Sequence, residues 1–490
     1  MFAIVIVIVV VAVLAYRRRS SSLLSFILHE IWTTASPILH LDGHSIPGPR
    51  YTLPQGQGRE KILTSRQASK KWQQEYGSIY RIWNGAWPEI ILTHPKDVEA
   101  WFSGKGEHFK AGTEPAGCLF SSVLSNAIGL INGGDWRTLR RKLDAFVNFQ
   151  ASNKLTGLLI QRAQEHVDSL AVDSNQTRQT LLAVPFLQPY PFFTTIEVFY
   201  GALTSAEREE MWSIGLDFLS VAGFVVQEGL NRTRFTRWLY SWPAWRALRT
   251  FEHRWATFNR RFVQERAGMD LPIVQLWGEI NGGITEKTIL STFTEAIFAN
   301  LDVTTFVLGS SILHIANNEA VQQRLCSEIE AEKDDLEGYI RRQDTFLHRC
   351  VLEGIRLEPI PAFSLAESCS EDKVLGGYVI PAGTNVVIDA TALNISNPFW
   401  GPDGDEFRPD RFESLTPLQL RYNLSTFGYG ARKCLGLHLG GKMVRALVVA
   451  LFQRYIVRVA TESRQGENDF ARDKNSFFSM FDAKIELENR

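Results

Sequence analysis

The segment FGYGARKCLG, residues 427–436, constrains the fold of this chain more than any other feature of its sequence. Gly428 and Gly430 allow backbone torsions that a side chain would forbid, so the segment can fold tightly beneath a flat cofactor. Cys434 lies at its end, before an apolar stretch that is expected to be helical from about residue 435. Amide N–H groups and the positive end of that helix would favour the thiolate, the form that iron requires. A lone cysteine beside a helix is usually a structural thiol, but the pattern F-G-x-G-x-R-x-C-x-G is complete here.

With this loop the sequence resembles the cytochrome P450 family, the heme-thiolate monooxygenases. The resemblance covers roughly residues 45 to 490 and implies a mainly α fold with small β-sheets (α+β), the cytochrome P450 fold. It also implies that Cys434 is the axial ligand of the iron of heme b, a thiolate ligation that favours cleavage of the O–O bond. Arg432 is expected to pair with a heme propionate. Phe427 and Gly428 are expected to lie against the cofactor.

A second motif, LEGIRLEP, places Glu353 and Arg356 three residues apart on a predicted helix, where the two side chains are neighbours. Taken alone, such a pair is usually an ordinary surface ion pair. In the family the pattern E-x-x-R is completed by an arginine from a later meander, and FRPDRF supplies Arg411. The resemblance therefore implies a buried structural triad.

A third motif, GGDWRTLRRK, places Trp136 and Arg140 on one face of a predicted helix whose Leu139 and Leu143 form an apolar stripe. The family uses W-x-x-x-R to hold heme propionates, and an indole N–H and a guanidinium both suit a carboxylate. The alternative is cation–π packing of the tryptophan and the arginine on a surface helix.

The segment FANLDVTT, residues 298–305, departs from the family pattern (A/G)-G-x-(D/E)-T-T. Ala299 and Asp302 match it. Asn300 replaces the usual glycine, and Val303 occupies the position of the first threonine, whose hydroxyl commonly takes part in proton delivery. Ala299 and Val303 are expected to border the heme.

Thr304 follows at once, but one residue along a helix turns the side chain by about 100°, so its hydroxyl cannot simply replace the missing one. Asp302 is the candidate acid. We expect proton delivery from Asp302 through ordered water, with the Asn300 amide or the substrate supplying a second hydrogen bond. The alternative for Asp302 is a helix carboxylate whose hydrogen bonds are satisfied.

The remaining sequence predicts the elements around these motifs. Strand formers and turn residues predict a hairpin over residues 79–83 and 90–93, and strands with turns over 374–388. Residues from about 95 to 357 are expected to be mainly helical, with one long helix from about Glu286 to Ala316 that carries FANLDVTT.

The amino terminus reads as a membrane anchor. Residues 1–16 form an almost unbroken apolar run, and three arginines, residues 17–19, follow it. The run is shorter than the roughly 20 residues of a spanning helix, so a cleaved signal peptide is the alternative, but the basic cluster lies on the wrong side for one. We expect a single-pass anchor in the endoplasmic reticulum membrane with the rest of the chain facing the cytosol. The predicted domains are an anchor with its basic stop (1–19), an amphipathic linker and proline-rich hinge (20–58), and a catalytic domain (59–490).

Composition excludes some classes of protein. The 52 Lys and Arg residues balance 53 Asp and Glu residues, which gives no reason to expect a nucleic-acid partner. Five cysteines without a C-x-x-C pair argue against a disulfide framework and a zinc ribbon, and fit a reducing compartment.

Apolar residues are expected to form the substrate pocket. The candidate walls are the loop 111–127, Phe298, Ala299, Val303, Phe363 and the stretch 476–481. They predict a largely apolar small-molecule substrate, with an aromatic one as an option. Residues 231–249 interleave arginines with aromatic rings, which suits contact with membrane lipid, although helix packing is the alternative.

The motifs together predict a monooxygenase that uses O2 and electrons from a separate NADPH-cytochrome reductase. The sequence looks similar to fungal secondary-metabolite members of the family. Because Val303 replaces a threonine, one alternative is the same fold catalysing ring formation, desaturation or isomerisation without net oxygen insertion. A more remote alternative is a heme binder or sensor without catalysis.

Overall fold

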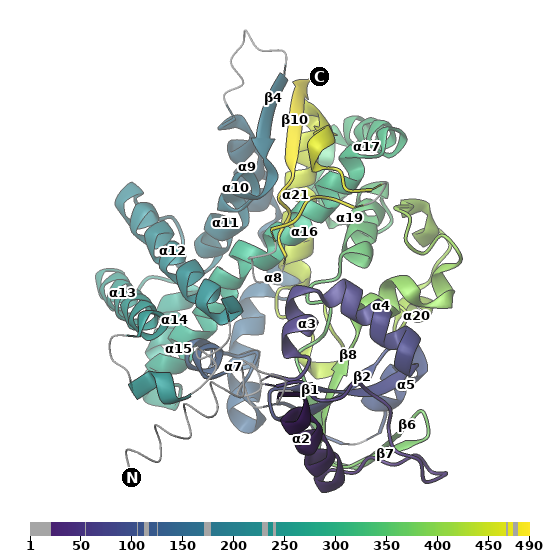
Figure 1. Cartoon of the computed structure of the whole chain (residues 1–490). Coiled ribbons are helices and arrows are strands. Elements are labelled where there is room, and N and C mark those ends of the chain that lie inside the picture. The colour runs from purple at the N-terminus through teal and green to yellow at the C-terminus, as the bar shows by residue number, and fades with distance from the viewer. Residues whose placement is uncertain are drawn as a thin grey trace. The chain divides into compact units, whose positions relative to one another are not determined.

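The structure, a computed structural model, describes residues 21–53, 55–104, 106–111, 117–124, 126–170, 178–227, 234–238, 242–466, 469–473 and 479–490 (Figure 1). The predicted anchor, residues 1–19, lies outside the described residues. The described chain is mainly helical with small sheets, as the sequence predicts. It divides into two compact units: the first contains the described residues up to 111 together with 363–392, and the second contains the described residues of 117–362 and 393–490.

The first unit is built on a five-stranded sheet of order β1-β2-β8-β5-β3. The strands are β1 (Ile79–Asn84), β2 (Trp87–Leu92), β3 (His108–Lys110), β5 (Glu367–Cys369) and β8 (Asn385–Ile388). A separate hairpin pairs β6 (Lys373–Leu375) with β7 (Tyr378–Ile380). The helices of this unit are α2 (Ser21–Ala35), α3 (Gly58–Leu63), α4 (Ser65–Tyr76) and α5 (Pro95–Phe102).

The predicted hairpin over residues 79–93 is confirmed. β1 and β2 pair antiparallel from Ile79 opposite Leu92 to Asn84 opposite Trp87. Gly85, in the turn, has φ +62°, a conformation that glycine adopts without strain. The proline-rich segment lies along β1, because Arg81 N–H donates to Pro47 O (2.8 Å) and Gln57 N–H donates to Trp83 O (2.7 Å).

The second unit contains most of the helices, as predicted for residues 95–357. They are α6 (Cys118–Leu124), α7 (Gly133–Val147), α8 (Phe149–Lys154), α9 (Thr156–Asp168), α10 (Ala183–Leu187), α11 (Pro189–Tyr200), α12 (Ser205–Gln227), α13 (Pro243–Glu265), α14 (Pro272–Gly278), α15 (Glu286–Phe293), α16 (Ala299–Ala316), α17 (Glu319–Ala331), α18 (Leu336–Arg341), α19 (Phe346–Leu357), α20 (Pro417–Leu420) and α21 (Leu437–Arg454). Its sheet has the order β4-β10-β9, with β4 (Arg178–Leu182), β9 (Tyr455–Val459) and β10 (Lys484–Asn489) all antiparallel.

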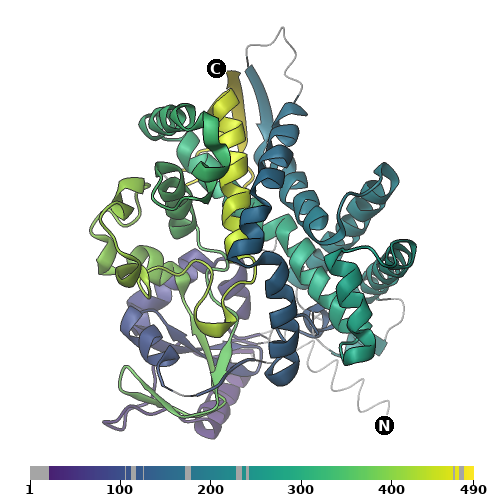
Figure 2. The same cartoon turned by 180° about the vertical axis from the view of Figure 1, so that it is seen from behind.

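The core of the second unit surrounds α16 and α21. α16 contacts α10, α11, α19 and α21, and α21 also packs along α9, as the view from behind shows in yellow and blue (Figure 2). Leu308, Ile312 and Leu313 of α16 are fully buried. Within the described residues, Glu286–Ala316 is long and apolar enough to cross a membrane, but 75% of its most apolar window is buried in the protein. It is therefore a core helix.

The predicted helix over residues 286–316 is confirmed, with one irregularity. A π-helical turn, Thr294–Phe298, joins α15 to α16. Such turns insert a residue into the helical register and frequently occur at functional sites. Here the turn directly precedes the segment with the predicted acid.

Candidate active site

The cysteine loop closes on itself as its glycines predict. Cys434 N–H donates to Phe427 O (2.7 Å), so the two ends of the loop meet. Gly428 and Gly430 have φ values of +75° and +63°, where a side chain would be strained. Helix α21 begins three residues after Cys434.

Cys434 has an exposed side chain, which separates it from the buried Cys326, Cys350 and Cys369. Desolvation by the surrounding protein atoms nevertheless raises the pKa of its thiol. Hydrogen bonds from the Gly436 and Leu437 amides and the charge of Arg140 act in the opposite direction. The expected stabilisation of the thiolate by the helix start is therefore present but weaker than the desolvation. A bound metal cation would displace the thiol proton, so a tightly folded loop that exposes one thiol fits the thiolate side of a heme.

Arg432 and Trp136 lie against each other. The Arg432 guanidinium carbon is 4.5 Å from the centre of the Trp136 ring. Arg432 Nη2 also donates to Gly129 O (3.3 Å) and Ile131 O (2.9 Å). The structure thus joins two predicted propionate partners from segments almost 300 residues apart, through cation–π packing and backbone contacts.

Arg140 lies one turn along α7 from Trp136. Its Nη1 donates to Lys433 O (2.9 Å), next to Cys434, and its Nε donates to both Asp144 carboxylate oxygens (3.1 Å). α7 is therefore fastened directly to the cysteine loop. Contact of Trp136, Arg140 and Arg432 with heme propionates stays a prediction.

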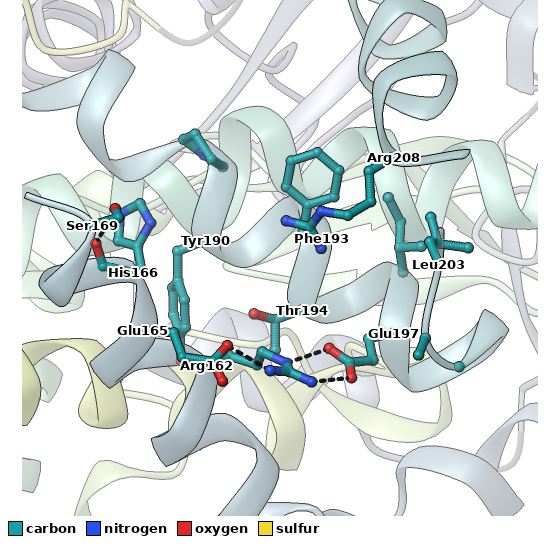
Figure 3. Close-up of a pocket in the computed structure, with 14 residues that line it drawn as sticks. Arg162, Glu165, His166, Ser169, Tyr190, Phe193, Thr194, Glu197, Leu203 and Arg208 are labelled. Carbon is teal, nitrogen blue, oxygen red and sulfur yellow. Dashed lines mark hydrogen bonds and ion pairs between the residues drawn. The ribbon is translucent and has the colours of Figure 1, made fainter. Parts of the chain in front are cut away.

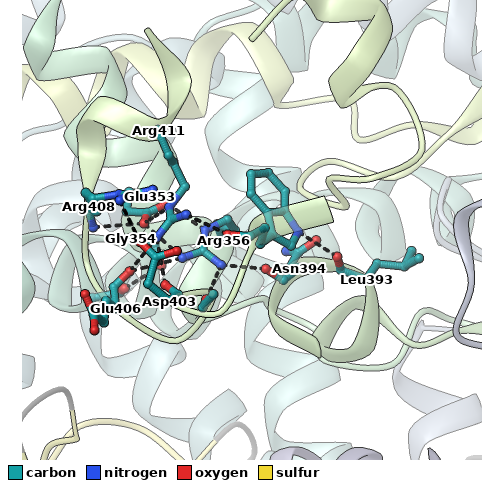
Figure 4. Close-up of polar contacts among 12 residues, drawn as sticks. Glu353, Gly354, Arg356, Leu393, Asn394, Asp403, Glu406, Arg408 and Arg411 are labelled. Atoms are coloured by element: carbon teal, nitrogen blue, oxygen red, sulfur yellow. Dashed lines mark hydrogen bonds and ion pairs between the residues drawn. The ribbon is translucent and has the colours of Figure 1, made fainter. Parts of the chain in front are cut away.

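Glu353, Arg356 and Arg411 form one buried cluster (Figure 4). Arg356 Nε donates to Glu353 Oε2 (2.6 Å), and Arg411 Nε donates to Glu353 Oε1 (2.7 Å). Glu353 and Arg356 have no exposed surface. The remaining guanidinium N–H groups donate to backbone carbonyls of the meander: those of Asn394, Trp400, Asp403, Gly404 and Glu406. The cluster holds this loop-rich segment to α19.

Asp302 lies in the first turn of α16 and is half-buried. Burial raises the pKa of its carboxyl from 3.8 to about 6. Among the described residues, no hydrogen bond or ion pair engages this carboxyl, so the alternative of a satisfied helix carboxylate is not supported. Its neighbours on the helix differ in exposure: Val303 is half-buried, whereas Thr304 and Thr305 are buried. For Ala299 and Asn300 the structure describes the backbone only, in the same first turn of α16.

Glu295 is a candidate that the motifs do not indicate. It lies on the π-helical turn, and its Oε2 accepts a hydrogen bond from Gly129 N–H (2.9 Å). The adjacent Ile128 N–H donates to Thr292 Oγ1 (3.2 Å). The carboxylate charge also contributes to the raised pKa of Cys434. No pattern in the sequence signals this residue, because its partner is a backbone amide far away in the chain.

Of the predicted pocket walls, Phe298 is wrong, and so is Phe481 at the end of the stretch 476–481. Phe298 is fully buried inside an aromatic cluster, with its ring centre 5.1 to 6.0 Å from those of its neighbours Trp255, Phe218, Phe251 and Phe192. Phe481 is 2% exposed and stacks on Phe306 at 4.9 Å. Both rings fill the protein core, because aromatic surface gains more from close packing than from facing a cavity.

The other predicted walls are only partly described. Residues 112–116, 125 and 476–478 lie outside the described residues, and Ala127 is fully buried. Phe363 belongs to the first unit, where it packs against Trp72 at 5.9 Å.

The arginine- and aromatic-rich segment 231–249 is also only partly described. Residues 231–233 and 239–241 lie outside the described residues. Trp238 is 85% exposed, as lipid contact would require. Trp245 is 3% exposed and its indole N–H donates to Thr236 Oγ1 (2.9 Å), so for Trp245 the alternative of helix packing is correct.

A surface cavity of about 470 Å³ lies between α9, α11 and the start of α12 (Figure 3). Arg162 crosses its floor and donates through Nε and Nη2 to the two carboxylate oxygens of Glu197 (2.6 Å each). Burial lowers the pKa of His166, which also lines the cavity, to about 4. None of the predicted site residues lines this cavity, so we do not regard it as the active site.

An exposed thiol lies at the end of a glycine loop, and Trp136, Arg140 and Arg432 pack around that loop. This arrangement suits a heme-thiolate centre, and the class of protein with such a centre is an oxidoreductase. Comparison with known proteins agrees. The family profile described as Cytochrome P450 matches residues 56–476, and the chain belongs to the cytochrome P450 family.

Three fungal relatives match over nearly the full length. The cytochrome P450 monooxygenase hasH of Aspergillus fumigatus is 38% identical, over 96% of this chain and 90% of the relative. The cytochrome P450 monooxygenase asaD of Aspergillus flavus is 34% identical, over 96% and 92%. The cytochrome P450 monooxygenase gliC of Aspergillus fumigatus is 33% identical, over 92% and 91%. The chain is thus an enzyme of the monooxygenase class, and the family implies a heme-thiolate cofactor, O2, a reductase and a small-molecule substrate.

Proposed function

We propose that this enzyme inserts one oxygen atom from O2 into a largely apolar small molecule during the biosynthesis of a secondary metabolite. The observation that carries the proposal is the geometry at Cys434, an exposed thiol in a loop braced by Arg140 and Arg432. Support for the type of substrate comes from the half-buried, apolar Val303 and from the similarity to fungal monooxygenases.

When bound, heme b would supply the activation of O2, and the Cys434 thiolate would hold its iron. Trp136, Arg140 and Arg432 would hold the propionates, since an indole N–H and two guanidiniums suit carboxylates. Binding in this way requires Arg432 to exchange backbone contacts for a charged partner, which gives a stronger hydrogen bond.

Proton delivery is assigned to Asp302. With its pKa raised to about 6, the carboxyl exists in both protonated and ionised forms near neutral pH, which suits an acid that must be reloaded. Val303 offers no hydroxyl, and the Thr304 hydroxyl lies about 100° around the helix. Water between Asp302 and the substrate would therefore carry the proton, with the Asn300 amide or the substrate as a further hydrogen-bond partner.

Electrons are proposed to come from an NADPH-cytochrome reductase that acts from the cytosol, with this enzyme anchored in the endoplasmic reticulum membrane by residues 1–19. The apolar run followed by three arginines supports the anchor and its orientation.

The ligation is tested by replacing Cys434. We expect Cys434→Ala to lose the thiolate-type CO difference spectrum and most bound heme, while Cys118→Ser, a half-buried cysteine on α6, keeps both. Retention of the thiolate-type spectrum in Cys434→Ala would contradict the assignment.

The reaction is tested by comparing, by high-resolution mass spectrometry, the metabolites of a host with and without the gene. We expect the missing product to contain one oxygen more than the compound that accumulates. A product that has only lost two hydrogens, or that has the same formula, would instead support ring formation, desaturation or isomerisation.

A further inference from the structure

The first unit contains a cluster of metal-ligand side chains that the heme chemistry does not use. The sequence HLDGH places His40, Asp42 and His44 within five residues, and one potential ligand atom of each lies within 4.8 Å of the other two. From this geometry we propose that the three side chains bind a divalent transition-metal ion of the imidazole-preferring kind, Zn²⁺ in particular.

The backbone holds these residues in a short hairpin over residues 38–46. His40 N–H donates to His44 O (2.8 Å), Gly43 N–H donates to His40 O (2.8 Å), and Ile46 N–H donates to Ile38 O (3.0 Å). Gly43 has φ +89°, which the tight turn requires and glycine tolerates. Ile38 and Ile46 are 4% and 5% exposed and anchor the two ends of the hairpin in the unit.

A second hairpin fixes the first from one side. Leu41 N–H donates to Gly377 O and Val379 N–H donates to Leu39 O (2.9 Å each), which aligns His40 with Tyr378 of β7. The ligand residues are thus placed by long-range backbone pairing as well as by the turn. Preorganisation of this kind reduces the ordering entropy that a metal must overcome.

The ring contacts indicate which nitrogens would bind. His44 Nε2 lies 3.1 Å from the Tyr378 hydroxyl, which leaves Nδ1 available. His40 Nε2 faces Gly377 so closely that a Cβ there would lie 2.0 Å away. His40 Nδ1 is 3.2 Å from Asp42 Oδ2 and accepts a hydrogen bond from Asp42 N–H (3.2 Å), which the metal ion would replace. A hydrogen bond from the second ring nitrogen to an outer partner is the usual support of a metal-binding histidine, and the Tyr378 hydroxyl is placed to accept it from His44 Nε2–H.

The donor set selects the metal. Two imidazoles and one carboxylate suit Zn²⁺ and related ions, while Ca²⁺ and Mg²⁺ require more oxygen ligands than this hairpin offers. The His40 and His44 rings stack with centres 4.4 Å apart, so rotation of the His44 and Asp42 side chains, both exposed, is needed to bring the ligand atoms to bonding distance. Solvent would complete the coordination, and the ion would cross-link the two arms of the hairpin.

The test measures Zn²⁺ binding to the full-length heme-loaded protein, without a histidine tag, by equilibrium dialysis and elemental analysis. We expect one Zn²⁺ per chain at micromolar free metal. Affinity should fall at least about tenfold in His40→Asn, Asp42→Asn and His44→Asn, and about tenfold in Tyr378→Phe, because the loss of an outer partner commonly has this effect. His253→Asn, an exposed histidine on α13, should bind as the wild type does.

Unchanged heme spectra would show that each variant is folded. Four results would each overturn the proposal. They are equal Zn²⁺ affinity of the wild type and His44→Asn, a loss of affinity in His253→Asn as large as in the ligand variants, Zn²⁺ binding only at millimolar concentration, and one Zn²⁺ per two chains. Because no heme-site residue takes part, failure here would leave the proposed monooxygenase activity intact.

Discussion

Desolvation by neighbouring protein atoms shifts the protonation equilibrium of two site residues, Cys434 and Asp302. The pKa of both groups is raised first by desolvation, and for Asp302 desolvation is the sole cause. At Cys434 the neighbouring amides and Arg140 offset part of the effect. Such perturbed groups are typical of catalytic sites, and in Asp302 the perturbation affects both stability and activity.

Asp302→Asn should stabilise the protein at neutral pH. Because folding raises the pKa of Asp302 from 3.8 to about 6, the ionised carboxylate destabilises the folded state. This cost is absent below pH 3.8 and is complete above about pH 6. Asparagine removes this cost, so we expect a gain of at most ~3 kcal/mol in denaturant unfolding at pH 7.5, and a much smaller gain near pH 4.

The same substitution should remove an ionisation near pH 6 from the pH profile of kcat/KM and lower kcat, with Asp334→Asn, an exposed aspartate, as the control. If turnover and coupling were unchanged in Asp302→Asn, Asp302 would have no role in proton delivery. An increase of turnover and coupling in Val303→Thr would strengthen that conclusion.

At the scale of elements, two connections hold the site together. The Glu353 cluster ties the meander of residues 393–411 to α19, and Glu295 ties the loop of residues 126–132 to the π-helical turn. The Glu353 cluster takes the place of secondary structure, because two arginines of the cluster donate hydrogen bonds to the backbone carbonyls of the meander. The second joins the turn before Asp302 to the loop that Arg432 also contacts.

Glu353→Gln should be strongly destabilising. The substitution leaves the buried Arg356 without a balancing charge and leaves Arg411 with only the more distant Asp403 carboxylate (3.6 Å), and breaking a buried pair typically costs about 3 to 5 kcal/mol. Asp410→Asn removes a surface partner of Arg324 and should cost less than about 1 kcal/mol. Denaturant unfolding and heme retention measure the stability of both variants. Equal losses of stability in Glu353→Gln and Asp410→Asn would contradict a stabilising role of the buried cluster.

Gly129→Ala should break the link to Glu295. A Cβ at residue 129 would lie 2.0 Å from Glu295 Oε1, so the carboxylate must move away. Loss of this acceptor should cost about 1 to 3 kcal/mol, and Glu295→Ala should cost a similar amount. The double variant should cost less than the sum of the two. Gly134→Ala, where a Cβ meets nothing within 4 Å, is the control. Full additivity would show that the two residues act independently.

At the scale of the whole molecule, the described chain has one helix apolar enough to span a membrane, and that helix forms the core of the second unit. The proposal of membrane attachment therefore rests on the sequence of residues 1–19 and on the exposed Trp238. Deletion of residues 1–19 should move most of the protein from the microsomal to the soluble fraction with its heme spectrum unchanged. A deletion variant that sediments with membranes as completely as the full chain would place the anchor elsewhere.

The sequence by itself determined the family, the closed loop at residues 427–434, the partners in the Glu353 cluster and the hairpin at residues 79–93. Each depends on residue types at short, fixed spacings, or on one motif completed by another. The tertiary structure decided that Phe298 faces the aromatic core, that the carboxyl of Asp302 is desolvated, and that Glu295 meets Gly129. It also placed Tyr378 beside the HLDGH hairpin. Desolvation and packing are sums over neighbours distant in the chain, and no local spacing encodes them.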